Sequence, residues 1–167
     1  MQKITPNLWF DDQAEDAANF YVSVFTSERR PGSSARDSRI VEVSRYGEAG
    51  PRPADMVLTV NFRLDGQEFT ALNGGPDFKF TEAVSFLVNC ESQEEVDYFW
   101  DALVDGGEPG QCAWLKDRYG LSWQIVPTAL AGLLSDPDPE KSQRVMKAML
   151  AMTKIEIDEL ERAAEAA

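Results

Sequence analysis

The sequence predicts an α+β protein built from two tandem modules, each with strands and one helix, followed by a helical tail. Residues 13–21 and 92–100 resemble each other, because both follow an apolar strand, have a helical pattern and end their core face in paired aromatics. In the segments between the predicted helices, apolar and polar residues alternate as they do in strands, whereas beyond residue 128 apolar residues recur at helical spacing. We therefore place the modules at about residues 1–77 and 78–128 and the tail at about 129–167, within one domain.

The first module begins with a strand and a helix. Residues 4–10 form a short apolar run, and residues 14–25 carry apolar side chains at the 3, 4 and 7 spacings of one buried helix face. Asp11 and Asp12 precede the helix, and either carboxylate is a suitable N-cap. The segment 27–37, rich in Gly, Pro, Ser and Arg, is predicted to be a loop.

Three more strands complete the first module. Residues 39–46 and 56–64 alternate as strands do, and residues 67–73 follow after a two-residue link. That link, Asp65-Gly66, is a strong signal for a tight hairpin turn, because Asp and Gly tolerate a positive φ. The predicted order is strand, helix, strand, strand, strand.

The second module repeats this order with one strand fewer, or with one very short strand. Residues 83–90 form an apolar strand, and Ser92 is the expected cap of a helix over residues 93–104. Residues 111–116 and 121–126 are two further strands joined by a turn.

The tail differs from both modules. The Asp-Pro-Asp-Pro segment at residues 136–139 opens a predicted helix over residues 140–152, and a final short helix is expected over residues 155–163. A stripe of methionines on the first of these helices favours core or dimer packing over a substrate surface: Met146, Met149 and Met152.

Charge and hydropathy exclude several classes of partner. With 16 basic and 29 acidic residues, the net charge of −13 repels nucleic acid. A small basic cluster, Arg29, Arg30, Arg36 and Arg39, is interpreted as a solvated loop rather than a phosphate site. No apolar run approaches the roughly 20 residues of a membrane span, and the first residues carry no signal-peptide stretch. We expect a cytoplasmic protein without nucleic-acid or membrane partners.

Histidine is absent from the chain. This absence removes Ser-His-Asp and Cys-His mechanisms and every His-ligated metal site. Any metal would depend on Asp, Glu, Gln, Asn or Cys. Cys90 and Cys112 do not form a C-x-x-C pair, so we interpret them as buried thiols rather than zinc ligands.

Five segments of the modules carry a family resemblance: residues 4–10, 69–76, 84–90, 93–97 and 111–127. They resemble PhnB-like proteins of the vicinal-oxygen-chelate superfamily, which also contains glyoxalases, bleomycin-resistance proteins and extradiol dioxygenases; the tail is similar over residues 144–155. The resemblance implies two βαβββ modules whose strands form a curled mixed sheet around a cleft, and it implies a homodimer. In metal-dependent members, four strand positions supply His, Glu or Gln ligands.

Those four positions fall at Thr5 or Pro6, at Val84 or Ser85, within residues 70–73, and at Gln124. Only Gln124 has a side chain that such a metal accepts, and one amide oxygen is too weak to hold a transition metal against water. We therefore expect no metal ion and no other cofactor.

The family often carries the description 3-demethylubiquinone-9 3-methyltransferase. A methyltransferase that uses S-adenosylmethionine typically needs a glycine-rich turn between a strand and a helix. Residues 73–76, Asn-Gly-Gly-Pro, end a strand, but no convincing helix follows them. We interpret the segment as a connecting turn and do not expect methyl transfer.

The implied cleft would be mainly apolar with a few polar groups, as small-molecule sites usually are. Because strand residues alternate between faces, Ser122 and Gln124 share one side. The candidate ligand contacts are Gln124, Ser85, Leu87, Leu8 and Ser122. Alternatively, Gln124 satisfies a backbone group within the sheet. Trp114 and Trp123 are expected in the core, and Asp117 is expected to cap the turn that it begins.

Three functions remain open. The first is metal-independent binding of a small molecule in the cleft. The second is an enzyme with an atypical site that uses Gln124, Ser85 or Cys90, the last of which precedes a helix whose dipole lowers a thiol pKa. The third is a structural or assembly role based on the dimer. The ligand, and whether any reaction is catalysed, do not follow from the sequence.

Overall fold

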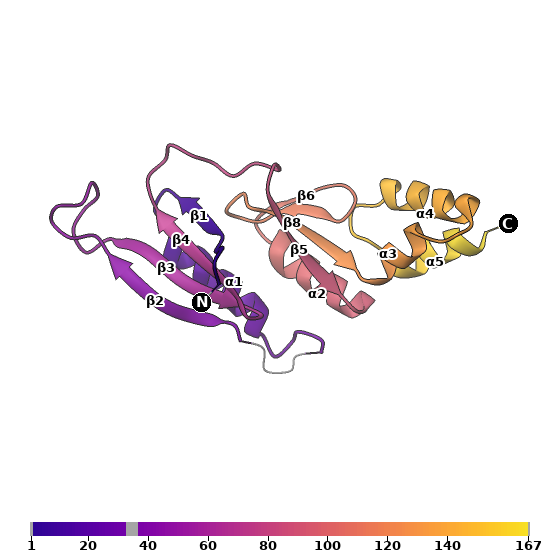
Figure 1. The fold of residues 1–167 in the computed structure, drawn as a ribbon, viewed down its shortest axis with the longest axis horizontal. Coiled ribbons are helices and arrows are strands. Elements are labelled where there is room, and N and C mark those ends of the chain that lie inside the picture. Colours follow the sequence, from indigo (N-terminus) through magenta and orange to yellow (C-terminus); the bar gives the residue numbers. More distant parts are fainter. Residues whose placement is uncertain (1, 33–36, 167) are drawn as a thin grey trace. The chain divides into compact units, whose positions relative to one another are not determined.

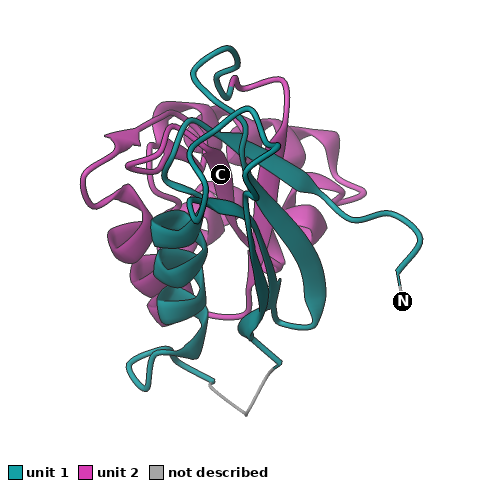
Figure 2. Ribbon diagram, turned by 90° about the vertical axis from the view of Figure 1, so that its left-hand side faces the viewer, with its two compact units in different colours: residues 1–80 teal, residues 81–167 magenta. Residues whose placement is uncertain are grey.

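The computed structural model describes residues 2–32 and 37–166 and has an α+β fold (Figure 1). The chain divides into two compact units, Met1–Phe80 and Thr81–Ala167, which are coloured separately in Figure 2. Each unit contains one four-stranded mixed sheet.

Unit 1 follows the predicted order of one strand, one helix and three strands. Its elements are β1 (Asn7–Phe10), α1 (Ala14–Thr26), β2 (Arg39–Arg45), β3 (Val57–Leu64) and β4 (Gln67–Asn73). The strands lie in the order β1-β4-β3-β2, with β1 parallel to β4 and the other pairs antiparallel. The strand predicted from residue 4 begins later, at Asn7.

The core of unit 1 lies between α1 and one face of its sheet. From Val60 to Leu64, alternate residues of β3 are buried, as the period-two pattern predicts. The ring of Tyr21 on α1 stacks on Phe62, with 6.2 Å between centroids, and Phe62 stacks on Phe69 at 5.3 Å. Burial of one such side chain contributes about 1.5–3 kcal/mol, so this aromatic column is a main attachment of the helix.

The N-terminus of α1 is capped by a residue distant in sequence, which corrects the expectation for Asp11 and Asp12. The N-cap residue is Gln13, and it makes no side-chain cap hydrogen bond. Instead the amide of Ala14 donates to Oδ1 of Asn73, at 2.8 Å. Asn73 also donates from Nδ2 to the carbonyl of Val57, at 3.0 Å, so the last residue of β4 joins helix and sheet.

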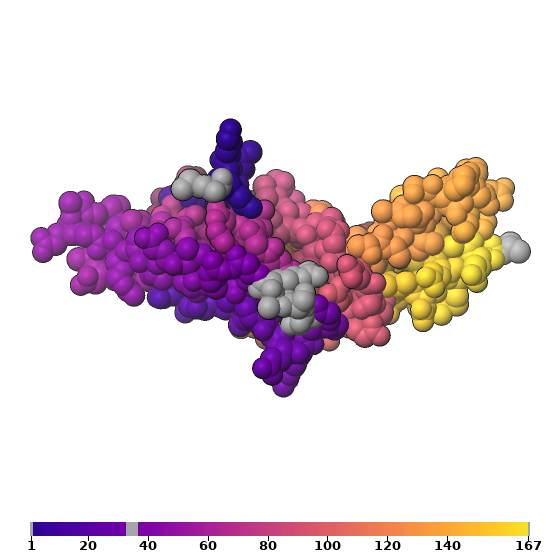
Figure 3. All heavy atoms as spheres, turned by 60° about the horizontal axis from the view of Figure 1, so that its bottom comes forward, coloured from indigo at the N-terminus to yellow at the C-terminus, as the bar shows by residue number. Residues whose placement is uncertain are grey.

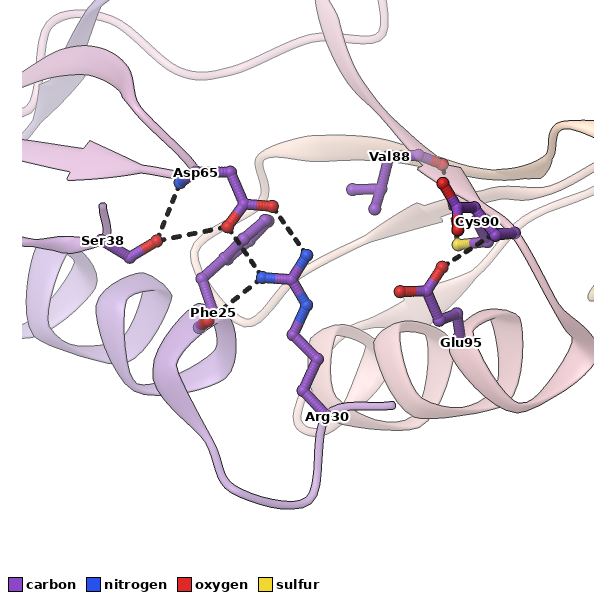
Figure 4. A network of polar contacts seen from close by, with 8 residues as sticks. Phe25, Arg30, Ser38, Asp65, Val88, Cys90 and Glu95 are labelled. Atoms are coloured by element: carbon purple, nitrogen blue, oxygen red, sulfur yellow. Dashed lines mark hydrogen bonds and ion pairs between the residues drawn. The ribbon is translucent and has the colours of Figure 1, made fainter. Parts of the chain in front are cut away.

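The predicted hairpin turn between β3 and β4 is confirmed. Asp65 and Gly66 have φ values of 48° and 85°, as a type I′ turn requires. The carboxylate of Asp65 also accepts two hydrogen bonds from the guanidinium of Arg30, at 2.7 and 2.6 Å (Figure 4). Arg30 is therefore a buried structural residue rather than part of a solvated loop, and Arg36 lies outside the described residues.

Unit 2 repeats the strand order of unit 1. Its sheet and first helix comprise β5 (Ser85–Cys90), α2 (Gln93–Val104), β6 (Glu108–Pro109), β7 (Trp114–Lys116) and β8 (Ser122–Pro127). The order β5-β8-β7-β6 again places the parallel pair first. The strand expected to be very short or missing is β6.

One face of the unit 2 sheet packs against α2. The buried residues of α2 include Val96, Phe99 and Leu103, and those of the facing strands include Leu115 and Ile125. Ser92 caps the helix as predicted, because its Oγ accepts from the amide of Glu95.

Three helices complete unit 2: α3 (Ala129–Leu134), α4 (Pro139–Ala151) and α5 (Ile157–Glu165). Short α3 was not predicted. The helices enclose a core of their own: Ala113, Leu130, Val145, Met152, Ile155, Leu160 and Ala164. Figure 3 shows α4 and α5, orange to yellow, packed side by side. In the part of the chain that is described, no helix combines the length and apolar character of a membrane span.

The segment before β7 corrects one predicted strand boundary. Residues 111–113 were expected to be extended, but Cys112 and Ala113 have φ values of 55° and 73°. Their amides donate to the carbonyls of Met152 and Thr153, at 2.9 and 2.8 Å. These long-range bonds to the tail compensate for an unfavourable left-handed backbone, and a sequence pattern does not reveal them.

Candidate functional site

The face of the unit 2 sheet opposite α2 brings together most of the predicted contact residues. Strand register pairs Ser85 with Ser122 and Leu87 with Gln124 in the parallel ladder. In the antiparallel ladder, Lys116 pairs with Ser122 and Trp114 with Gln124. Paired residues point to the same side of a sheet. We call this surface the open face of unit 2: Ser85, Leu87, Trp114, Lys116, Ser122, Gln124 and Val126.

Gln124 uses its amide for a side-chain contact on this face rather than for a backbone group. Its Nε2 donates to Oγ of Ser85, at 2.9 Å. The amide carbonyl has no hydrogen-bond partner among the described residues and is oriented by this contact. Leu87, directly opposite Gln124 in the ladder, is 49% exposed. An oriented amide beside exposed apolar surface is a suitable surface for a small molecule.

A cavity of about 160 Å³ lies at the β6–β7 side of the same sheet. Its lining residues are Glu82, Glu108, Pro109, Gly110, Trp114, Leu115, Lys116 and Ser122. Ser122 is 0% exposed, and its hydroxyl has no hydrogen-bond partner within residues 2–32 and 37–166. A buried polar group without a partner costs about 1–3 kcal/mol, so this hydroxyl is available to a bound molecule.

The cavity contains one cation and two carboxylates. Nζ of Lys116 lies 2.6 Å from Oε1 of Glu82. That hydrogen bond lowers the pKa of Glu82 and raises the pKa of Lys116, so both groups are charged at neutral pH. Glu108 stands opposite Lys116 in the β6–β7 ladder and adds a second negative charge.

Sequence reasoning named Ser122 but missed other residues of this cavity. Lys116 was missed because the predicted turn over residues 117–120 pairs it with Leu121, whereas the structure pairs it with Ser122 and so places both on one face. Trp114 was assigned to the core, but it is only partly buried and lines the cavity, whereas Trp123 is in the core as expected. Glu82 lies before β5 in a segment without a periodic pattern, so no sequence signal pointed to it.

Leu8 does not lie on an exposed face. It is 6% exposed and pairs with Ala71, a fully buried residue of β4, on the side of the unit 1 sheet that carries the core. Strand parity shows which residues share a face, but it does not show which face the helix covers. The placement of Leu8 is that of a core residue.

Asp117 caps its turn, as predicted, and also anchors the core. Its Oδ1 accepts from the amides of Tyr119 and Leu121, at 2.8 and 3.1 Å. Its Oδ2 accepts from Nε1 of Trp123, at 2.8 Å. Because three donors hold this buried carboxylate, it maintains the β7–β8 hairpin that carries Lys116 and Ser122.

The corresponding face of unit 1 has polar side chains that bind one another. Oγ1 of Thr70 donates to Asn61 at 2.8 Å, and Nδ2 of Asn61 donates to Glu42 at 3.3 Å. A cavity of about 230 Å³ lies beside them, lined by Thr5, Val41, Asn61, Phe62, Glu68, Phe69 and Thr70.

The residues at the superfamily's metal positions do not fit a transition metal. Thr70 and Ser85 offer only hydroxyl oxygens, and each is already hydrogen-bonded to a neighbouring amide group. Asn73 uses its side chain to join α1 and β3. Among the described residues, no three His, Cys, Asp or Glu side chains are grouped so as to hold a metal. Such metals prefer imidazole, thiolate or carboxylate ligands.

The glycine pair after β4 serves packing rather than cofactor binding. A Cβ on Gly74 would lie 2.2 Å from the indole of Trp9, and Nε1 of Trp9 donates to the carbonyl of Gly75 at 2.8 Å. Residues 74–84 contain no helix. The indole thus occupies the space that glycine leaves, and the turn lacks the helix that a cofactor loop would precede.

The thiol of Cys90 is remote from the open-face side chains along its own strand. Cys90 is fully buried, and its Sγ lies 3.8 Å from the carbonyl of Val88 (Figure 4). Strand alternation separates it from the face of Ser85 and Leu87. The carboxylate of Glu95 accepts from the amide of Glu91 at the same end of α2, so this region is occupied by helix capping.

Comparisons with known proteins give a consistent family. The model of a family described as 3-demethylubiquinone-9 3-methyltransferase matches residues 2–126. A PhnB protein from Bacillus cereus is 37% identical, with 76% of this chain and 100% of that chain covered and a TM-score of 0.64. Protein PA1353 from Pseudomonas aeruginosa is 19% identical, with coverage of 76% and 98% and a TM-score of 0.57.

No curated protein matches the chain. The family match covers residues 2–126, so the expected resemblance over residues 144–155 stays a prediction. The tail helices lie outside the matched residues.

Proposed function

Because the chain belongs to the PhnB-like family of the vicinal-oxygen-chelate superfamily, we propose that it binds a small molecule on the open face of unit 2 without a metal ion. This is the family labelled 3-demethylubiquinone-9 3-methyltransferase. The observation that carries the proposal is the Gln124 amide. Ser85 holds its nitrogen, while its carbonyl is available beside the exposed side chain of Leu87.

The same face supplies the other features of a small-molecule site. Trp114, opposite Gln124 on β7, and Val126, two residues further along β8, extend the apolar surface, and the neighbouring cavity adds the unpartnered hydroxyl of Ser122. Apolar surface contributes affinity, and a few fixed polar groups select the ligand.

Methyl transfer is not part of this proposal. The turn at Gly74 is filled by the indole of Trp9, and no helix follows it. A metal-dependent glyoxalase or dioxygenase reaction is equally unsupported, because the ligand positions hold hydroxyls and amides that bind one another.

The test is a thermal-shift screen of the full chain against small molecules, followed by calorimetry of each stabilising compound. A ligand at 100 times its Kd should stabilise the fold by about 2.7 kcal/mol. We expect Leu87→Asp to abolish this stabilisation and Gln124→Ala to weaken binding about five- to tenfold, through loss of a hydrogen bond of about 1–1.5 kcal/mol.

Val41→Asp is the matched control, because Val41 is an equally exposed apolar residue on β2 of unit 1, at 52%. It should leave ligand binding unchanged. Compounds that stabilise the Leu87→Asp and Gln124→Ala variants as strongly as the natural protein would place the site elsewhere and refute the proposal.

A homodimer remains part of the proposed function, since superfamily members commonly form one. Light scattering on the purified chain should give twice the mass of 18.6 kDa. A monomer at micromolar concentration would exclude this part of the proposal and leave the ligand site untouched.

A further inference from the structure

We infer that the cavity beside β6, β7 and β8 selects a small organic cation, a primary amine that carries an apolar group about the size of benzene. This inference rests on the proposed function, because the cavity adjoins the open face of unit 2. It specifies the ligand's charge, its size and the two groups that recognise it, Ser122 and Glu108.

The size of the cavity sets the first limit. Its volume is about 160 Å³, and an apolar cavity of about 150 Å³ is known to hold one benzene molecule. Trp114, Pro109 and Leu115 supply apolar wall. The walls are built closely, because a Cβ on Gly110 would lie 2.8 Å from the carbonyl oxygen of Trp114.

The buried hydroxyl of Ser122 provides a hydrogen-bonding group for the ligand. It lies on β8 between Ser85 and Lys116 in the strand ladders, lines the cavity and has no partner in the described part of the chain. Neither neighbouring side chain satisfies it, because Ser85 is bonded to Gln124 and Lys116 to Glu82. An ammonium N–H can donate to this oxygen without displacing an existing hydrogen bond.

The charges favour a cation over an anion. Glu82 neutralises Lys116, and Glu108 remains as a surplus carboxylate without an ion pair among the described residues. Lys116 faces both carboxylates, so the three groups together carry one net negative charge, which repels an anion and attracts a cation. The indole of Trp114 adds a ring face, which attracts a cation held above it.

The test titrates the full chain with three probes of one size and different charge: benzylamine, benzyl alcohol and benzoate. Two-dimensional NMR of backbone amides follows the titration at pH 7. We expect benzylamine to bind at least about tenfold more tightly than benzyl alcohol and to shift the amide resonances of Lys116 and Ser122. Benzoate should give no saturable shift. Equal binding of benzoate and benzylamine, or shifts that omit the cavity residues, would overturn the inference.

Two variants test the recognising groups. Ser122→Ala and Glu108→Gln should each weaken benzylamine binding about three- to tenfold, and Glu108→Gln should leave benzyl alcohol nearly unaffected. The controls Ser23→Ala and Glu48→Gln remove the same groups from exposed positions of unit 1 and should change nothing. Unchanged benzylamine affinity in both cavity variants would also overturn the inference.

The outcomes separate this inference from the proposed function. If the protein binds benzylamine no more tightly than the other two probes, while binding of a screened compound still depends on Leu87 and Gln124, the inference alone fails. If neither the three probes nor any screened compound binds, both fail.

Discussion

The sheets of the two units share one strand order, yet the polar side chains on the faces opposite their first helices are paired differently. In unit 1, Thr70, Asn61 and Glu42 form a chain of hydrogen bonds across three strands. In unit 2, the carbonyl of Gln124 and the hydroxyl of Ser122 have no partner among the described residues. A ligand gains little from groups that satisfy one another, so the same topology provides a closed polar surface in one unit and a receptive one in the other.

The units also differ in how their first helices begin. α1 depends on Asn73, which is 59 residues from Ala14 in sequence, whereas α2 is capped by the adjacent Ser92. The long-range cap joins helix, β3 and β4 at a buried point, and the local cap serves only its own helix.

The largest expected effect comes from removing the long-range cap of α1. Asn73→Ala should lower the free energy of unfolding by about 2–4 kcal/mol, because the buried amide of Ala14 and the carbonyl of Val57 both lose their partner. Ser92→Ala should cost about 1 kcal/mol, as an ordinary N-cap does. Urea unfolding of both variants measures the difference. If Ser92→Ala is as destabilising as Asn73→Ala, the long-range cap does not have the structural role assigned to it.

The same contrast explains what could be predicted from sequence. Ser92, the Asp65-Gly66 turn and the order of strands and first helices along the chain are local signals, and all three are confirmed. The cap by Asn73 could not be predicted, since its partner is 59 residues away. Helix α3 has six residues and β6 two, which is too short for a periodic pattern.

The candidate site was predictable to a similar extent. Period-two alternation correctly grouped Ser122 with Gln124, and register then joined them to Ser85 and Leu87. It did not show that Leu8 lies on a covered face, because coverage depends on where the helix packs. The salt bridge of Lys116 with Glu82 is likewise a tertiary contact, between residues 34 positions apart in the printed sequence.

An intermediate effect on stability is expected from adding a methyl group at Gly74, in the turn that follows β4 of unit 1. Gly74→Ala should destabilise the protein by about 1–3 kcal/mol, because the new methyl group must displace the ring of Trp9. Gly47→Ala is the matched control, since nothing lies within 4 Å of its added Cβ.

Thermal unfolding separates the two glycine variants. Equal stability of Gly74→Ala and Gly47→Ala would show that the indole does not need the glycine. The packing explanation of the Gly74-Gly75 turn would then be lost.

The smallest expected effect concerns the tail, which extends unit 2 beyond the family match and has no counterpart among the described residues of unit 1. Its attachment to α2 includes the pair Lys154–Asp97, at 2.5 Å, and the amide of Gln93, which donates to Asp97 and to the carbonyl of Ile155. Partial burial raises the pKa of Asp97, but the hydrogen bonds from Lys154 and Gln93 outweigh it, so the pKa is lowered overall.

A lowered folded-state pKa means that the carboxylate stabilises the fold above its unfolded pKa, and that this contribution is lost as pH falls through the folded pKa. Asp97→Asn should therefore cost under about 1 kcal/mol at pH 7, because the pair is partly exposed and screened, and should cost nothing below the folded pKa. Urea unfolding of the natural protein, Asp97→Asn and the exposed control Asp12→Asn across the acid range measures this. A difference between Asp97→Asn and the natural protein that persists unchanged at the acid end would show that the side chain acts through packing, and that the tail is held by its apolar core and backbone bonds rather than by this charge.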